Sequence, residues 1–275
     1  MGGAKTVFFP RNMAEALSCL NSSSEPQVMA GCTLERGLPS SSIMVNATQI
    51  EELGVIDPHE RFIDFGSAAT FSQILGTAKR RLPSVFFESI ESIATPFVRN
   101  RATIGGNICA PGRRRTLFSA LLALDARLEF KGENETLFIH LGTFNKVPQG
   151  MMLTKIRVPV DEWNISIFKR PGPARIFTEE SASFVFLAMT GKGGLSDLRI
   201  AYSQHTAYRS RALENRLIGM RLPLTQKTVS AILDETAERL KNSLDSSESP
   251  HSTLDSPVAA RQFLDLLEFS LTQLM

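Results

Sequence analysis

Residues 97–107 read FVRNRATIGGN, and this stretch places two adjacent glycines, Gly105 and Gly106, between apolar residues. A glycine pair lets the backbone approach a ligand at a place where any side chain would collide. Loops of this kind often hold phosphate. For one such loop taken singly, an ordinary tight turn is the more frequent explanation. The pair therefore indicates a ligand site only in combination with other features.

A second loop with similar properties precedes it in the chain. The short apolar segment 27–30 enters Ala30-Gly31-Cys32-Thr33 as a strand enters a tight loop. This loop offers a glycine, backbone N–H groups and a hydroxyl. Two such loops can grip one diphosphate from two sides. Neither matches the P-loop or the Gly-x-Gly-x-x-Gly pattern that opens a helix, so the sequence argues against a Rossmann dinucleotide fold.

Bulk composition excludes several classes of protein. The 275 residues carry a net charge of +2, which is too balanced to indicate a nucleic-acid partner. No apolar stretch reaches the roughly 18 residues of a membrane helix, and the N-terminus lacks the apolar core of an export signal. The three cysteines are widely spaced, which argues against a disulfide framework. We expect a cytoplasmic protein of two domains, without a membrane or nucleic-acid partner.

Hydrophobic periodicity predicts both helices and strands, with a domain boundary near 159–163. A long loop is expected through the glycine pair, and a mobile connection over 242–256. Helices are expected to begin near Asn12, Thr70 and Ser84, and to cover 116–124, 210–218, 225–240 and 257–274. Strands are expected at 27–30, 43–46, 61–66, 126–130, 136–139, 153–158, 165–169, 183–189 and 198–203.

Other chemical signatures are weak. The histidines His59, His140, His205 and His251 are far apart and lack partners at ligand spacing, so no metal site is expected. No nucleophile elbow or Ser-His-Asp signature is present, and no catalytic side chain is predicted. Cys109, just after the glycine pair, is best explained as a small buried hydrophobe.

Taken together, the motifs resemble the FAD domains of molybdenum hydroxylases. The order and spacing agree for FPR at 9–11, EAL at 15–17, MAGCT at 29–33 and FVRNRATIGGN at 97–107. The resemblance continues through LLALDA at 121–126, Phe168-Lys169, SRA at 210–212, Glu214 and LIG at 217–219. It covers nearly the whole chain. The sequence is similar to the FAD-binding (medium) subunit of the xanthine dehydrogenase and carbon monoxide dehydrogenase type.

This resemblance implies an α+β fold. Residues 1–160 would form a p-cresol methylhydroxylase-type FAD-binding domain, with subdomains at about 1–55 and 56–160. A C-terminal α+β domain, a sheet plus helices, would follow over 161–275.

The resemblance also implies a role in electron transfer. In such flavin-dependent oxidoreductases, electrons leave a molybdenum centre on a molybdopterin-binding large subunit and pass through the [2Fe-2S] clusters of a small subunit. They then reach FAD, which reduces NAD or another acceptor. The cofactor expected for this chain is FAD, and the expected partners are those two subunits.

Site residues carry over position by position. Ala30, Gly31, Cys32 and Thr33 of the first loop would wrap the diphosphate, and Thr103, Ile104, Gly105, Gly106 and Asn107 would hold it from the second. Backbone donors are expected to make most of these contacts. Thr116 stands where the family has an aspartate that bonds the ribityl region. Lys169 matches a lysine near the flavin ring, although a solvated lysine at a strand end explains it equally well without the family.

The chain departs from the family pattern in two places. Leu34 replaces an acidic residue, with Glu35 one position later, and Thr116 replaces the aspartate. The run Arg113-Arg114-Arg115 either neutralises a diphosphate or is a solvated loop, and the solvated loop is the more frequent case. These departures leave open a degenerate, non-flavin assembly subunit of the same fold. An unrelated nucleotide- or anion-binding module is the third hypothesis.

Overall fold

A computed structural model describes residues 6–22, 26–33, 43–77, 81–112, 115–174, 176–191, 193–242, 251–254 and 256–275. These residues fall into two compact units. The first lies within 1–80, 95–110 and 126–160, and the second within 81–94, 111–125 and 161–275. The break after residue 160 coincides with the expected boundary. Segments 81–94 and 111–125, however, belong to the second unit, although they precede that boundary.

The first unit begins with a small parallel sheet. Its strand order is β1 (Thr6–Phe8), β3 (Ile43–Asn46), β2 (Gln27–Met29). Helix α1 (Met13–Ser22) buries Met13, Ala16, Leu17 and Leu20 in a core that also contains Val45. Its start is a capping box, because Asn12 Oδ1 accepts the Glu15 N–H at 2.9 Å while Glu15 Oε2 accepts the Arg11 N–H. The helix thus begins where the sequence places it.

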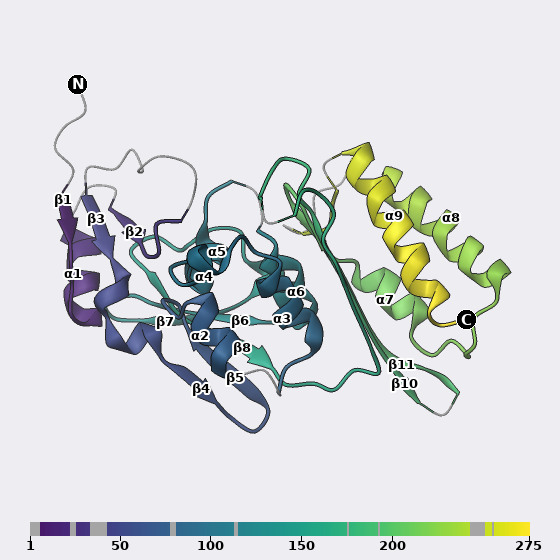
Figure 1. The fold of residues 1–275 in the computed structure, drawn as a ribbon, viewed down its shortest axis with the longest axis horizontal. Coiled ribbons are helices and arrows are strands. Elements are labelled where there is room, and N and C mark those ends of the chain that lie inside the picture. The colour runs from purple at the N-terminus through teal and green to yellow at the C-terminus, as the bar shows by residue number, and fades with distance from the viewer. Residues whose placement is uncertain are drawn as a thin grey trace. The chain divides into compact units, whose positions relative to one another are not determined.

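A five-stranded antiparallel sheet forms the rest of the first unit (Figure 1). Its order is β4 (Ile56–Pro58), β5 (Phe62–Gly66), β8 (Met152–Pro159), β6 (Arg127–Lys131), β7 (Thr136–His140). Short helices accompany it: α2 (Phe71–Thr77), α4 (Pro96–Arg99), α5 (Ile104–Cys109), η1 (Ala47–Gln49), η2 (Glu51–Gly54) and η3 (Leu141–Thr143). Helix α5 packs on β5 and β8, which fixes the glycine pair against this sheet.

The segment around the glycine pair corrects the sequence expectation. Residues 96–109 contain α4 and α5 rather than one long loop. Pro96 occupies the first turn of α4, a position that tolerates its missing N–H. Thr103 caps α5, since its Oγ1 accepts the Gly106 N–H at 3.1 Å. Two glycines lower helix propensity, which hid this short helix from the pattern.

The second unit is a sheet covered on both faces. Its antiparallel order is β12 (Ala207–Tyr208), β11 (Gly194–Ser203), β10 (Ser183–Gly191), β9 (Ile165–Lys169). Along β10, Phe184 and Phe186 point into the core of helices α7 (Arg211–Leu217), α8 (Gln226–Asn242) and α9 (Pro257–Thr272). Helix α6 (Leu117–Ala123) packs on β10 and β11, and α3 (Ser84–Glu91) packs on α6 and β9 (Figure 1). Their apolar faces explain why 81–94 and 111–125 belong here.

Most predicted elements form, with differences at their ends. Strands β1, β4 and β12 have two or three residues each and were not expected. Strand β11 begins at Gly194, four residues before the expected start at 198. The connection expected over 242–256 lies mostly outside the described residues. Among the helices that the structure describes, none is long and apolar enough to cross a membrane.

Candidate functional site

The first unit brings the two predicted loops together. A Cβ placed on Gly31 would lie 1.9 Å from the carbonyl oxygen of Arg101 and 3.1 Å from Cα of Ala102. The loop Ala30–Thr33 therefore runs directly against the residues that lead into Thr103. Only a glycine allows this approach. The two loops, read as separate motifs from the sequence, form one continuous region.

Cys32 gives the first loop a sharp turn. Its φ of 52° lies in the left-handed region, which costs an L-residue roughly 1–2 kcal/mol. The exposed thiol donates to the Ala30 carbonyl oxygen at 3.2 Å. Strain of this kind concentrates at ligand sites, where the surrounding structure maintains it. The conformation of Cys32 thus supports a binding loop.

The two adjacent glycines lie in different environments. A Cβ on Gly105 would lie 2.6 Å from the Ser67 carbonyl oxygen and 2.7 Å from Ser67 Cβ, next to the end of β5. At exposed Gly106 an added Cβ meets a single atom, Thr103 Oγ1 at 2.9 Å. The gap expected at Gly105 is therefore filled by Ser67, because the α5 backbone packs on that turn. Gly106 is the more open of the two positions, with the Thr103 hydroxyl as its one close neighbour.

Backbone donors of the second loop are already engaged, contrary to the expectation that they make most diphosphate contacts. The Gly105 N–H donates to Ser67 O at 2.9 Å, and the Ile104 N–H donates to Ala69 O at 3.0 Å. The Asn107 N–H donates to Thr103 O at 3.0 Å. A ligand would reach these groups only as a second acceptor. A polar ligand at this loop would therefore depend more on side chains than the sequence suggests.

Asn107 supplies such a side chain. Its Oδ1 atom is buried and has no hydrogen-bond partner in the part of the chain that the structure describes. A buried polar atom without a partner costs about 1–3 kcal/mol, and native structures keep few of them. The amide can present its oxygen or, turned over, its NH₂ group. FAD offers both hydroxyl donors and phosphate acceptors, so the residues present fit this cofactor.

Thr116 and Lys169 lie in the second unit. Thr116 is buried just before α6. Lys169 ends β9, and its Nζ lies 4.7 Å from the ring centroid of Phe269, a favourable cation–π distance. With Glu88, Ser166–Phe168, Phe269 and Gln273 it lines a shallow cavity of about 220 Å³. Arg113, Arg114, Leu34 and Glu35 lie outside the described residues.

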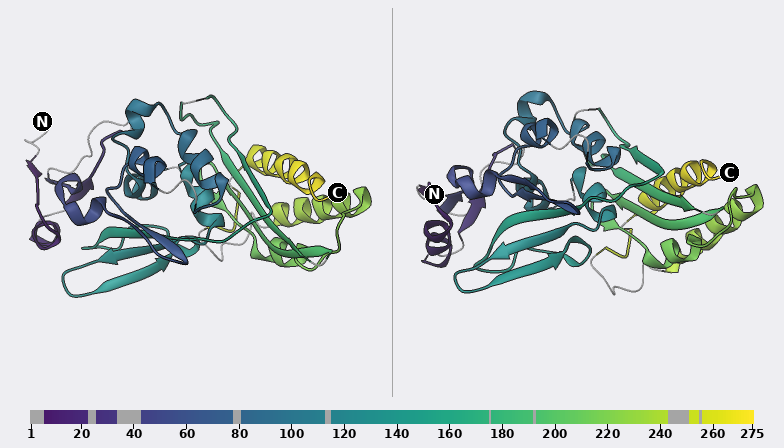
Figure 2. Two further views of the ribbon diagram at one scale, coloured as in Figure 1. Left: turned by 60° about the horizontal axis from the view of Figure 1, so that its bottom comes forward. Right: turned by 90° about the horizontal axis from the view of Figure 1, so that it is seen from below.

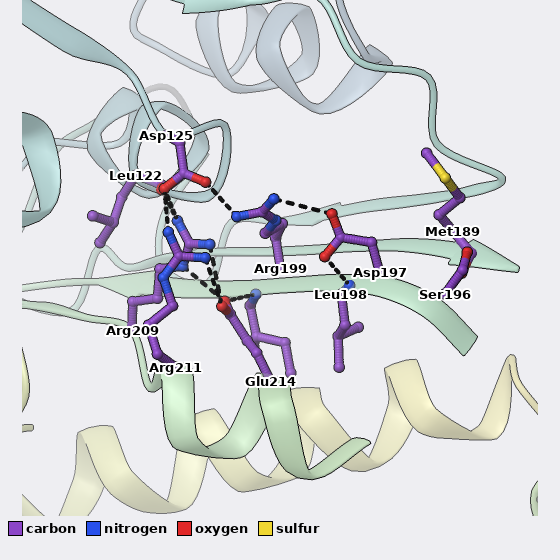
Figure 3. Close-up of polar contacts among 11 residues, drawn as sticks. Leu122, Asp125, Met189, Ser196, Asp197, Leu198, Arg199, Arg209, Arg211 and Glu214 are labelled. Carbon is purple, nitrogen blue, oxygen red and sulfur yellow. Dashed lines mark hydrogen bonds and ion pairs between the residues drawn. The ribbon is translucent and has the colours of Figure 1, made fainter. Parts of the chain in front are cut away.

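An ion-pair cluster in the second unit was not anticipated (Figure 3). Asp125, at the end of α6, accepts hydrogen bonds from Arg209 at 2.8 Å and also from Arg199 and Arg211. Glu214 of α7 accepts from Arg209 Nε at 2.7 Å, from Arg211 and from the Ile200 N–H of β11.

This cluster balances its charges. Asp125, Asp197 and Glu214 face Arg199, Arg209 and Arg211. The side chains of Glu214 and Arg209 are 1% and 5% exposed, so neither charge is compensated by water. Burial lowers the pKa of Arg199, and the charges of Asp125 and Asp197 more than offset it, so the net shift is upward. The cluster ties α6, β11 and α7 together.

The cluster explains part of the family resemblance. The motifs LLALDA at 121–126 and SRA at 210–212 with Glu214 are far apart in sequence. In the fold their charged members, Asp125, Arg211 and Glu214, meet (Figure 3). These motifs therefore serve packing. For the described residues, no group of three or more His, Cys, Asp or Glu side chains is placed to hold a metal ion.

The first unit brings the loop Ala30–Thr33 against the segment that leads into Thr103–Asn107, and the two loops form a glycine-rich cradle on an α+β scaffold. Comparison with known families gives the particular class. Residues 3–161 match the family described as the FAD binding domain in molybdopterin dehydrogenase, and the chain belongs to this family. The resemblance stated from the motifs, and FAD as the cofactor of the family, are confirmed.

Individual relatives agree. The xanthine dehydrogenase FAD-binding subunit of Escherichia coli O157:H7 is 24% identical over 247 residues, with 82% of each chain covered. Carbon monoxide dehydrogenase from Hydrogenophaga pseudoflava gives a TM-score of 0.80 at 18% identity, over 100% of this chain and 98% of the other. Quinoline 2-oxidoreductase from Pseudomonas putida 86 gives 0.77 at 15% identity, with the same coverage. The expected fold class is confirmed.

Proposed function

We propose that this chain is the FAD-containing electron-transfer subunit of a molybdenum hydroxylase of the xanthine dehydrogenase type. Its partners would be a molybdopterin-binding large subunit and a [2Fe-2S] small subunit, assembled in the cytoplasm. Bound FAD would supply the redox chemistry, taking electrons from the clusters of the partner and passing them to NAD or another acceptor. Membership in the FAD-binding family supports the proposal.

One observation carries the placement of the cofactor. Asn107 keeps a buried amide oxygen without a partner among the described residues, directly after the open position at Gly106. The close approach of Gly31 to Arg101 places the other loop alongside. A polar ligand that enters at Gly106 and bonds Asn107 would remove the cost of that orphaned atom.

The proposed binding residues follow from this arrangement. Ala30, Gly31, Cys32 and Thr33 would border the diphosphate from one side. Thr103, Ile104, Gly105, Gly106 and Asn107 would border it from the other, with the Asn107 amide as the principal side-chain contact. Thr116 at the ribityl group and Lys169 at the flavin ring remain proposals from the resemblance. So does the division into an FAD-binding domain at 1–160 and a C-terminal domain at 161–275.

The test is the flavin content of the purified full chain after incubation with FAD. We expect the wild type to become yellow and Gly106→Val to lose binding, because the valine fills the open position. Overpacking of this size costs roughly 1–3 kcal/mol, which corresponds to about five- to 150-fold weaker binding. Gly76→Val is the control, since it makes the same change at an exposed glycine of α2 where a Cβ meets open space.

Thermal unfolding of each variant reports on the fold, because the valine at 106 also crowds the Thr103 cap. A folded Gly106→Val protein with wild-type flavin content contradicts the placement. Loss of flavin in both variants shows that the assay does not report on the cradle.

A degenerate, non-flavin assembly subunit is the second candidate. The engaged N–H groups of Ile104, Gly105 and Asn107 favour it, since a diphosphate would find few free donors there. A colourless wild type that cannot be reconstituted with FAD, yet still co-purifies with the other subunits, selects this function. Binding of a mononucleotide in place of FAD selects the third hypothesis, an unrelated nucleotide module.

A further inference from the structure

Strand β7 forms one edge of the five-stranded sheet in the first unit (Figure 2). Within the described ranges no strand pairs with its outer side. Thr136, Leu137, Phe138 and His140 are exposed, and Phe138 is 66% exposed. A row of backbone groups and a large aromatic ring therefore face solvent together.

The hairpin register identifies which backbone groups point outward. The Gly132 N–H donates to Glu135 O at 2.9 Å, so residues 132 and 135 form the closing hydrogen-bonded pair of the β6–β7 turn. Bonded and non-bonded pairs alternate along an antiparallel ladder. The pairs of Thr136, Phe138 and His140 with β6 are therefore non-bonded pairs. Their N–H and C=O groups point away from β6, toward the open edge.

The two edges of this sheet are not alike. Proteins protect edge strands with charges, proline or short length, because open edges recruit other strands. The opposite edge, β4, has three residues and includes Asp57 and Pro58. Strand β7 reads TLFIH and contains neither proline, glycine, lysine nor a carboxylate. Only the β7 edge lacks protection.

We propose that β7 pairs antiparallel with β7 of a second copy of this chain, about a two-fold axis at Phe138. The outward groups of Phe138 then meet those of the other Phe138, and Thr136 meets His140 across the axis. Leu137 faces the other Ile139. The register is self-complementary, because every outward donor faces an outward acceptor.

Charge distribution supports this register. Glu133 and Glu135 precede β7, and their two carboxylates outnumber the one cation at that end, Lys131 of β6 beside Thr136, whereas His140 ends β7 beside Arg127 of β6. Antiparallel pairing places the acidic end of one copy next to the basic end of the other. The two open edges are both used, so the assembly closes as an isologous dimer and does not grow into a filament.

The test is sedimentation of the full chain over a wide concentration range. One five-residue strand buries less area than a standard interface, so we expect a concentration-dependent dimer. Phe138→Lys should weaken dimerisation at least tenfold, because like charges would meet at the axis. Thr136→Pro removes an outward N–H that the hairpin does not use, and it should weaken the dimer as well. Val55→Lys, next to β4 and 52% exposed at the wild-type valine, is the matched control and should leave the dimer unchanged.

Hydrogen exchange gives an independent readout. The amides of Thr136, Phe138 and His140 should exchange more slowly as the dimer forms. A wild-type chain that stays monomeric at all concentrations overturns the proposal. A dimer that Phe138→Lys and Thr136→Pro leave intact overturns it too. Protection of β7 only in a complex with a different subunit overturns it in favour of a strand from that subunit. None of these outcomes depends on flavin content.

Discussion

The glycine cradle of the first unit and the ion-pair cluster of the second are built in opposite ways. The second loop of the cradle is a run of consecutive residues, Thr103 to Asn107, whose cap and helix are local. The cluster joins Asp125 to Arg199, 74 residues away, and to Arg209, 84 residues away. A candidate ligand loop can thus be recognised from a short motif, whereas the cluster exists only after folding.

The two regions also treat buried polar groups differently. Each carboxylate of the cluster contacts at least one guanidinium group, which is the usual condition for buried charge. The cradle leaves Asn107 Oδ1 without a partner among the described residues. Within the cluster, Arg199 Nε is also buried without a hydrogen-bond partner in the described part of the chain, but the Arg199 guanidinium still forms ion pairs with Asp125 and Asp197.

The largest expected effect comes from removing a buried carboxylate of the cluster. Glu214→Ala leaves Arg209 buried with one carboxylate partner fewer and the Ile200 N–H without its acceptor. Breaking a buried pair costs about 3–5 kcal/mol. We expect the midpoint of thermal unfolding to fall by roughly 10 °C. Glu235→Ala, at a half-buried surface site paired with Arg239 and Arg216, is the control, and its effect should stay below about 1 kcal/mol. Equal shifts of the unfolding midpoint in the two variants would contradict a structural role for the cluster.

The next effect sharpens the difference between the two glycines. In Gly105→Ala the new Cβ lies 2.6 Å from Ser67 O, so the backbone must shift. We expect a loss of roughly 1–3 kcal/mol in unfolding free energy, measured with urea. Gly76→Ala in α2 meets no neighbour and should raise stability by about 0.5–1 kcal/mol. If Gly105→Ala leaves the unfolding free energy unchanged, Ser67 can move aside, and the packing role of Gly105 is wrong.

A smaller effect tests whether the proposed site extends to Lys169. If this lysine lies near the flavin ring, Lys169→Ala should lower the reduction potential, because the reduced anion loses a nearby positive charge. An exposed charge pair is worth about 1 kcal/mol, which is roughly 20 mV for a two-electron couple. Spectroelectrochemistry of the reconstituted protein measures it, with Lys169→Arg expected to retain the wild-type value. Identical potentials in all three proteins would leave Lys169 with its contact to Phe269 alone.

The smallest effect concerns pH and the core of the second unit. Burial raises the pKa of Tyr208 above its ordinary value, against a lesser opposing effect of its hydrogen bond with Ser210. The unfolded chain therefore loses this proton first, at about pH 10. The contribution of the Tyr208 hydroxyl to the free energy of unfolding is intact below pH 10, and it is lost as the pH rises through the higher folded pKa. The unfolding free energy is measured by urea denaturation at pH 9 and at pH 11. Over this range it should fall less for Tyr208→Phe than for the wild type. Parallel pH profiles would contradict this.

Local patterns predicted much of the fold. The capping box at Asn12 and Glu15 predicted α1, alternation predicted β5, and hydrophobic patterning predicted β8 and β10, because each signal depends on neighbours in sequence. The short helix α5 was missed, since its glycines disfavour a helix that the Thr103 cap and packing on β5 and β8 stabilise. The difference between Gly105 and Gly106 was also missed. Nothing in the sequence shows that Ser67 packs against one of them.

The sequence by itself determined the family and its cofactor and located the two glycine loops, because these motifs are runs of contiguous residues. Tertiary structure alone decided that Gly31 lies on Arg101, that Ser67 fills the place beside Gly105, and that Asp125 meets Arg199, Arg209 and Arg211. The physical reason is that these interactions act over different distances along the sequence. Backbone conformation is set over a few residues, whereas packing and charge pairing join segments that become neighbours only in the folded chain.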